Sequence, residues 1–165
     1  LFKPHILLPY MYSVLCRQYN TPFIVNDNVN VAIASNADGI HIGQEDMGLK
    51  DVREIVGENM IIGISAHTVE EAKFAQENGA DYIGIGAVFE TSTKNDVDVI
   101  PYEKVKSICG AVDIPKVAIG GINAENILKL KGSGIDGVAV VSAIFGAKDI
   151  GKATKELYTL SNNLI

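Results

Sequence analysis

Short apolar runs rich in β-branched residues alternate along this chain with segments whose apolar residues recur every three or four positions. The runs are PFIV (22–25), GIHI (39–42), MIIGIS (60–65), YIGIG (82–86), KVAIG (116–120) and GVAVVS (137–142). Most of them are almost continuously apolar, which is typical of strands buried on both faces, and the segments between them have helical spacing. This alternation predicts an α/β fold in which helical crossovers join parallel strands.

A closed barrel and a doubly wound sheet both fit that alternation, and two features favour the barrel. Glycine-rich strand ends such as GIG and IGG occur, and a helix-to-strand phrase recurs as NADG, NGADY and SGIDG. No G-x-G-x-x-G follows a strand, so dinucleotide binding has little support. We therefore predict one domain over residues 1–165 with a (β/α)8 TIM barrel fold, of which about six of the eight βα units are recognisable.

The charge and the composition of the chain limit its partners. The 20 acidic and 14 basic side chains give a formal net charge of −6, which argues against binding to a nucleic-acid backbone. No apolar run is long enough to span a membrane, and LFKPHILLPYM, interrupted by Pro4 and Pro9, is a weak match to a signal peptide. Cys16 and Cys109 have no metal-ligand spacing, so we expect reduced thiols and a cytoplasmic protein.

Polar side chains and a pair of glycines follow the predicted strands at the end where TIM barrels carry their active residues. In chain order they are Asn26, Asp27, Gln44, Glu45, Asp46, Ser65, His67, the run 91–94, Gly120, Gly121 and Ser142. Because the carboxyl ends of parallel strands face one mouth of a barrel, we expect side chains from adjacent strands to converge there.

Asp27 and Asp46 follow adjacent strands with no adjacent lysine or arginine, so their carboxylates would repel unless a cation lay between them. Mg²⁺ suits such oxygen ligands, because it binds through one or two carboxylates together with waters and substrate phosphates. The alternative is that each aspartate only caps the helix that follows it. The spacing alone favours the capping interpretation.

The Gly120–Gly121 pair opens a loop into a helix predicted from Asn123, and its backbone N–H groups can approach an anion. The last loops of TIM barrels are a frequent phosphate site, so here the functional interpretation leads. His67 suits either acid–base chemistry or a helix start. His5 and His41 are interpreted as structural.

Taken together, these strand ends resemble the thiamine phosphate synthase family. The matching pieces occur in family order over about residues 12–150: PFIVND (22–27), ADGIHIGQEDM (37–47), IGISAHTVEEA (62–72), GADYIGIGAVFETSTK (79–94), VAIGGIN (117–123) and GIDGVAVVSAIF (134–145). Single pieces such as GADYIG also occur in other phosphate-binding barrels, so the specificity comes from the ordered set. The resemblance implies a transferase of thiamine biosynthesis that joins a pyrimidine methyl diphosphate to a thiazole phosphate and releases pyrophosphate.

The resemblance also implies a role for each matching residue. Asp27 and Asp46 would hold the Mg²⁺ that neutralises the diphosphate leaving group, and Ser65 and Lys94 would be the catalytic pair. Asn26 and Ser65 would contact the pyrimidine, and Lys94 its diphosphate. The thiazole phosphate would be bound by Thr91, Ser92, Thr93, Gly121, Val141 and Ser142. The implied mechanism is dissociative: C–O cleavage gives a stabilised pyrimidine methyl cation, which the thiazole nitrogen traps.

The chain departs from the family pattern at its start. The first two family strands, the second of which ends in a Gln-Leu-Arg-Glu-Lys motif, have no match, and LFKPHILLPYM matches nothing expected. Lys3 and Arg17 lie in no such motif and are not assigned its diphosphate contacts. Two alternatives remain: a thiazole tautomerase-like enzyme that uses His67, and an inactive barrel fragment that binds only a phosphate ligand or a partner chain. The expected partners are small-molecule substrates, without nucleic acid or membrane, and a homo-oligomer stays open.

Overall fold

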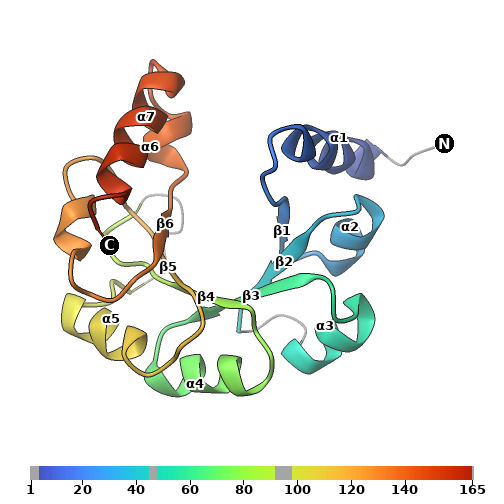
Figure 1. The fold of residues 1–165 in the computed structure, drawn as a ribbon, viewed down its shortest axis with the longest axis horizontal. Helices are drawn as coiled ribbons and strands as arrows, with labels where there is room; N and C mark the ends of the chain where they lie inside the picture. The colour runs from blue at the N-terminus through green and yellow to red at the C-terminus, as the bar shows by residue number, and fades with distance from the viewer. Residues whose placement is uncertain (1–3, 45–47, 92–97, 165) are drawn as a thin grey trace. The chain divides into compact units, whose positions relative to one another are not determined.

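A computed structural model describes residues 4–44, 48–91 and 98–164 (Figure 1). Strands and helices alternate along these residues, as the sequence predicts. The chain forms two compact units, the first from residues 1–65 and 77–81 and the second from residues 66–76 and 82–165. The assignment of residues 1–165 to a single domain stays a prediction.

The first unit is built on three parallel strands that pair in chain order. They are β1 (Ile24–Asn26), β2 (Gly39–Ile42) and β3 (Ile61–Ala66). Its helices are α1 (Pro4–Gln18), α2 (Val29–Ala34) and α3 (Leu49–Val56), of which α2 and α3 cover one face of the strands (Figure 1). Ile40, Ile42 and Ile62 are fully buried, so the apolar runs read from the sequence form the centre of this unit.

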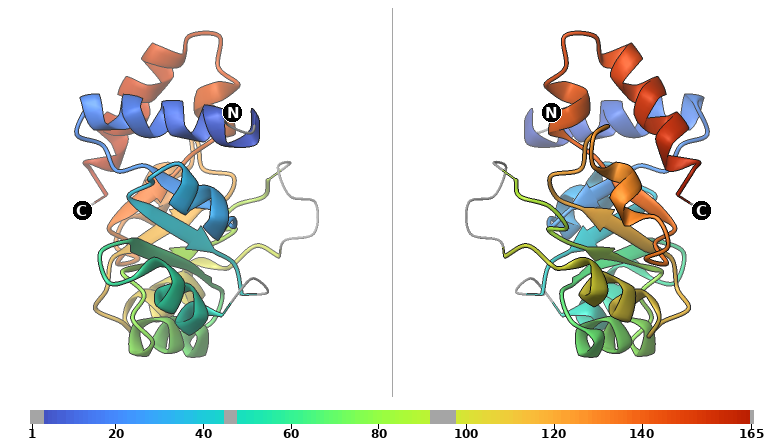
Figure 2. Two further views of the ribbon diagram at one scale, coloured as in Figure 1. Left: turned by 90° about the vertical axis from the view of Figure 1, so that its right-hand side faces the viewer. Right: turned by 90° about the vertical axis from the view of Figure 1, so that its left-hand side faces the viewer.

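The second unit repeats this construction. Its parallel strands, again paired in chain order, are β4 (Tyr82–Ile85), β5 (Lys116–Ile119) and β6 (Gly137–Ala139). Its helices are α4 (Val69–Glu77), α5 (Tyr102–Cys109), the short 3₁₀ helix η1 (Ile127–Leu130), α6 (Ser142–Phe145) and α7 (Ile150–Ser161). Figure 2 shows α6 and α7 side by side. Ile83, Ile85 and Ile108 are fully buried and centre the core.

Strand pairing follows the order of the chain in both units. A TIM barrel adds its strands in sequence, each parallel to the one before it. In each unit every strand pairs in parallel with its chain neighbour. The predicted α/β fold of the TIM-barrel type is confirmed, with six strands among the described residues.

Two helices differ from the prediction. The start LFKPHILLPYM, to which the sequence assigns no helix, contributes the residues from Pro4 onward to α1, with Pro9 inside the helix. A proline is tolerated as the first helical residue because its missing N–H needs no partner there. The helix expected from Asn123 is replaced by a turn and the four residues of η1. The Asn126 side chain accepts from the Asn123 N–H at 2.8 Å, and the Asn123 side chain accepts from the Glu125 N–H at 2.9 Å. These side chains bind the backbone donors locally, which competes with an α-helix.

The aspartate of the recurring helix-to-strand phrase forms the same clasp three times. Its carboxylate accepts from the backbone N–H of a residue at the amino end of the preceding strand, and its own N–H donates back to that residue's carbonyl oxygen. The carboxylate bonds measure 2.8, 2.8 and 2.9 Å for Asp38 to Phe23, Asp81 to Ile62 and Asp136 to Lys116. The repeated phrase therefore encodes a repeated join between a strand and the next one in the chain.

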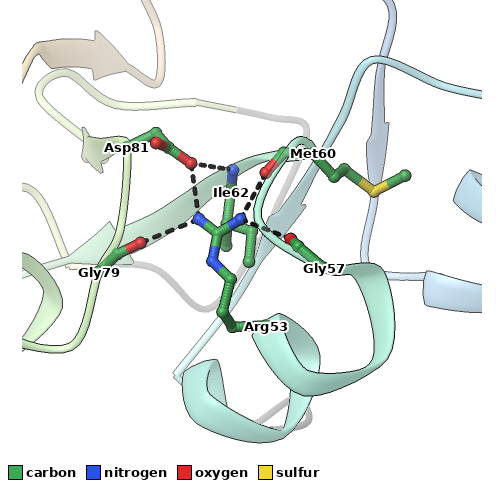
Figure 3. Close-up of polar contacts among 6 residues, drawn as sticks. All are labelled: Arg53, Gly57, Met60, Ile62, Gly79 and Asp81. Atoms are coloured by element: carbon green, nitrogen blue, oxygen red, sulfur yellow. Dashed lines mark hydrogen bonds and ion pairs between the residues drawn. The ribbon is translucent and has the colours of Figure 1, made fainter.

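Arg53 of α3 reinforces the second of these clasps (Figure 3). Its guanidinium donates to the carbonyl oxygens of Gly57 and Met60 at 3.0 and 2.7 Å. It also donates to the carbonyl of Gly79 at 3.0 Å and to the Asp81 carboxylate at 2.8 Å. One planar cation thus binds the end of α3, the start of β3 and the turn that precedes β4, a fork geometry that lysine lacks.

The two ends of α4 carry recognisable capping features. Thr68 accepts from the Glu71 N–H at 3.1 Å, while the Glu71 carboxylate accepts from the N–H of His67 rather than from that of Thr68. Gly79, with φ of 85°, follows α4 in the left-handed conformation expected of a helix-terminating glycine. Among the described residues, none of the helices has the length and apolar character needed to span a bilayer.

Candidate active site

The carboxyl end of β1 presents Asp27 in an unusual conformation. Asp27 has φ of 65°, and the N–H of Asn28 donates to the carbonyl of Asn26 at 2.8 Å across it. An i to i+2 bond around a positive φ is the rarer, strained form of the γ-turn. Such strain in a non-glycine residue persists where the surrounding structure holds it and is frequent at functional sites.

The alternative interpretation of Asp27 as a helix cap is wrong. The N-cap of α2 is the next residue, Asn28, whose side chain accepts from the Val31 N–H at 3.0 Å. Asp27 is exposed, and its own N–H donates to the carbonyl of His41 at 2.8 Å. The sequence left two interpretations of the Asp27 carboxylate, a helix cap and a metal ligand. Because Asp27 does not cap α2, the metal-ligand interpretation is favoured.

The ends of β2 and β3 meet at Ser65, which the sequence singled out correctly as a strand-end residue. His41 Nε2 lies 3.1 Å from Ser65 Oγ. Gln44 Nε2 donates to the Ser65 carbonyl at 2.5 Å. His41 is also the strand partner of Asn26, so Asn26, Asp27, His41 and Ser65 form one group across three neighbouring strand ends.

His41 was missed by the sequence argument, which interpreted it as structural because it alternates with buried isoleucines. Its side chain is half-buried and reaches a polar partner on the next strand. The signal that could have found it is its position two residues before the end of GIHIG, beside a strand that ends in a serine. Alternation along a strand shows on which face of the sheet a side chain lies, but not which side chain of the neighbouring strand it contacts.

The second unit carries the Gly120–Gly121 loop. These glycines have φ of 99° and 64°, which side chains rarely adopt. A Cβ atom at Gly120 would lie 2.5 Å from Ala87 Cβ, and one at Gly121 would overlap the Glu90 carbonyl oxygen. The glycines are therefore required by the close approach of residues 87–90. Asn126 Nδ2 donates to the Gly121 carbonyl at 2.9 Å and holds the loop.

The anion site expected at Gly121 would not have the dipole of a long helix behind it. The helices that follow β5 and β6, η1 and α6, have four residues each and supply no helix dipole of consequence. Backbone N–H groups at a loop are what remains for an anion. Val141 is 56% exposed and Ser142 is the exposed first residue of α6, and Thr91 is half-buried.

Several predicted site residues lie outside the described residues. They are Glu45, Asp46, Ser92, Thr93 and Lys94. The convergence of Asp27 with Asp46, and the roles of the 92–94 run, therefore stay predictions.

His67 lies at the start of α4 in the second unit. Its Nδ1 is 3.1 Å from Glu71 Oε2, and its backbone N–H donates to the same oxygen at 2.7 Å. Both side chains are partly exposed. This geometry is that of a helix-start contact, one of the two interpretations that the sequence left open for His67.

A cavity of about 790 Å³ in the first unit lies away from these residues. It is bounded by residues near the amino ends of the strands, including Arg17 at the end of α1, Asn36 and Asn59. The Arg17 guanidinium donates to the Asn36 carbonyl oxygen at 2.6 Å, which is a structural contact. Active residues of parallel α/β folds lie at the carboxyl ends, so this cavity is not assigned to the site.

One carboxylate among the described residues, that of Asp27, is suited to binding a Mg²⁺ ion. Magnesium is bound through one or two carboxylates and keeps waters and substrate phosphates as its other ligands. The exposed Asp27 carboxylate has no hydrogen-bond or ion-pair partner among the described residues and is held at a strand end. Among those residues there is no group of three or more histidine, cysteine, aspartate or glutamate side chains suited to a metal.

Parallel strands added in sequence, with polar residues at their carboxyl ends, define an α/β enzyme of the TIM-barrel class. The model of the family described as thiamine monophosphate synthase matches residues 11–144. The chain belongs to this family, whose members are transferases of thiamine biosynthesis.

Individual relatives agree with the family. The chain is 52% identical over 145 residues to the thiamine-phosphate synthase of Clostridium tetani, covering 88% of this chain and 69% of that protein. It is also 52% identical over 143 residues to the thiamine-phosphate synthase of Pyrococcus abyssi, covering 87% of this chain and 69% of the relative. The solved thiamine phosphate pyrophosphorylase of Pyrococcus furiosus aligns with a TM-score of 0.90 and 42% identity over 98% of this chain and 77% of its own.

Proposed function

We propose that the chain forms thiamine phosphate from 4-amino-2-methyl-5-hydroxymethylpyrimidine diphosphate and thiazole phosphate. The bond between the pyrimidine methylene carbon and the diphosphate oxygen breaks, the diphosphate leaves with the electron pair, and the thiazole nitrogen forms the new C–N bond. The observation that carries the proposal is Asp27, an exposed carboxylate in a strained turn that the fold does not use as a cap. Family membership supplies the substrates.

The chain's own residues would hold and orient the two substrates. Asp27, together with Asp46, would bind Mg²⁺, which when present neutralises the charge that develops on the departing diphosphate. Asn26 and Ser65 would hold the pyrimidine, and Lys94 would donate to the diphosphate. A site of this kind needs no nucleophile from the protein, because stabilisation of the leaving group is the main task.

The thiazole phosphate would be bound in the second unit. Thr91, Ser92 and Thr93 offer hydroxyls, and the backbone at Gly121 and Val141 and the Ser142 hydroxyl offer further donors. Glycine at 121 suits this role as well as its packing role, since the absence of Cβ exposes the backbone N–H groups on both sides.

The experiment measures pyrophosphate release from the purified chain as the Mg²⁺ concentration is varied. Release is expected to need both substrates and Mg²⁺, to stop in EDTA, and to fall about a hundredfold in Asp27→Asn. Asn28→Asp, which keeps a capping oxygen on α2, is the matched control and should remain active. Undiminished release by Asp27→Asn in EDTA would refute the metal assignment.

The tautomerase alternative has a separate readout. It would require His67 as an acid–base group. The contact of the His67 ring with Glu71 is typical of a helix start and does not itself support acid–base catalysis. Isomerisation of a thiazole tautomer that disappears in His67→Ala, in a chain that releases no pyrophosphate, would favour the alternative.

We also propose a cellular compartment and an oligomeric state for the chain. Both cysteines are free thiols, Cys109 being buried, which suits the cytoplasm that we propose as its compartment. Its partners would be the two small-molecule substrates and further copies of itself. Analytical ultracentrifugation would test the homo-oligomer, and a single species at the mass of one chain would exclude it.

A further inference from the structure

Ser65 is held by two side chains from the end of the neighbouring strand. The ring of His41 reaches its hydroxyl, with 3.1 Å between Nε2 and Oγ. The amide of Gln44 donates to its backbone carbonyl at 2.5 Å. The hydroxyl and the main chain of one residue are thus fixed from the same segment, residues 41–44.

His41 is itself fixed, which makes it a rigid support. Its backbone pairs with Asn26 of β1 on one side and with Gly63 of β3 on the other. Its carbonyl oxygen accepts from the N–H of Asp27 at 2.8 Å. The half-buried ring therefore projects from a central strand whose two neighbours carry the other site residues.

A hydroxyl that is already held in one orientation binds a ligand with a smaller loss of entropy than a hydroxyl that rotates freely. A serine hydroxyl has one donor and two acceptor positions and rotates about its C–O bond. A contact with His41 Nε2 uses one position and aims the others, so that the hydroxyl reaches a ligand with less loss of rotational freedom.

We propose that His41 and Gln44 are positioning residues that act on the pyrimidine substrate through Ser65 and without touching the substrate. This inference rests on the proposed function in one respect, the contact between Ser65 and the pyrimidine. It predicts that the effect of changing His41 disappears when the Ser65 hydroxyl is absent.

The test is a double-mutant cycle on the full chain, read as the dissociation constant of the pyrimidine diphosphate by calorimetry without thiazole phosphate. His41→Phe keeps a planar ring and removes its nitrogens. It should weaken binding about tenfold when Ser65 is present and less than about twofold in the Ser65→Ala background. The same factor in both backgrounds, or no change in either, would overturn the inference.

Two variants separate positioning from a merely structural role. His41→Gln carries an amide that reaches toward the former Nε2 position and should bind within about threefold of the original chain. Gln76→Leu removes a glutamine whose side chain accepts from the N–H groups of Asp113 and Ile114 at 2.6 and 3.2 Å. As the matched control for Gln44→Leu, it should lower the unfolding midpoint and leave the dissociation constant unchanged, whereas Gln44→Leu should raise the dissociation constant. An equal effect of the two glutamine changes on binding would contradict the proposal.

Folding and function are distinguished by further measurements. If His41→Phe does not fold, the cycle between Gln44→Leu and Ser65→Ala tests the same coupling. In the ligand-free chain, Ser65→Ala should shift the ¹⁵N resonance of His41 Nε2, and an unchanged resonance would overturn the inference whatever the turnover. A chain that binds the pyrimidine with the expected coupling but releases no pyrophosphate would refute the proposed function alone.

Discussion

Asp27 combines an exposed carboxylate with a backbone conformation that favours glycine. We predict that Asp27→Gly raises the free energy of unfolding by about 1 kcal/mol, because glycine adopts a positive φ without the Cβ penalty. The same change should reduce Mg²⁺-dependent pyrophosphate release about a hundredfold. Urea denaturation and a pyrophosphate assay on one preparation measure both effects.

The control for that prediction is Asp27→Asn, since asparagine also tolerates the left-handed region. It should lose activity with little change in stability. A glycine variant that is no more stable, or that keeps its activity, would contradict the account of Asp27 as a strained functional residue.

Cys109 lies buried at the end of α5, and burial raises its pKa to about 11, with Asp136 adding to the shift and Lys116 opposing it. A thiol whose pKa is higher in the folded chain than in the unfolded chain stabilises the fold below the unfolded pKa. That contribution is lost as the pH rises through the folded pKa. We therefore predict that the free energy of unfolding declines between about pH 9 and pH 11, and that Cys109→Ala declines less. Parallel slopes for the two chains, measured by urea denaturation, would contradict it.

Single site residues are predictable from the sequence only in part. Asp27 and Ser65 are predictable, because polar residues at the end of a buried run belong to the carboxyl edge of a parallel sheet. The choice of Asn28 over Asp27 as the cap of α2 is not, since both residue types cap helices equally well. The contact of His41 is not predictable either, because the partner of a side chain on the next strand depends on the strand register, which the alternation within one strand does not contain.

The aspartate clasps join neighbouring elements and predict a graded loss of stability. Asp81→Ala should lower the free energy of unfolding by about 1–3 kcal/mol, because the N–H of Ile62 and the Arg53 guanidinium both lose their acceptor. Asp81→Asn keeps an acceptor for Ile62 and loses only the ion pair, whose aspartate is about half exposed, so its loss should be smaller. Urea denaturation of both variants measures the order, and an equal loss would mean that the backbone bond contributes nothing.

The elements were predictable where burial decides and not where side chains compete with the backbone. The six strands of the described residues follow runs that the core requires to be apolar, and their bounds differ from the runs by a few residues at most. The segment after Asn123 has the apolar spacing of a helix, yet Asn123 and Asn126 bind its first backbone donors and leave only η1. That competition depends on local geometry and leaves no mark in the periodicity.

The candidate site residues belong to both units: Asn26 and Ser65, assigned to the pyrimidine, lie in the first unit, and Ser142, assigned to the thiazole phosphate, lies in the second. We predict that Asn26→Ala raises the KM for the pyrimidine diphosphate about tenfold and leaves the KM for thiazole phosphate within twofold. Ser142→Ala should have the reverse effect. Each removes one hydrogen bond to a polar or charged substrate, which is worth about 1.5 kcal/mol. Steady-state kinetics with one substrate varied at a time measures both, and a variant that raises the two values equally would contradict the division.

The three clasps of Asp38, Asp81 and Asp136 have a consequence for how such a chain can change over time. They fasten the amino ends of the strands, while the residues assigned to substrates follow the carboxyl ends. Mutation can therefore lengthen or rewrite the loops after β1, β2 or β5 while the joints that hold the strands stay intact. A lineage built this way can explore new substrates without first losing its fold, and a protein engineer can graft loops onto it by the same route.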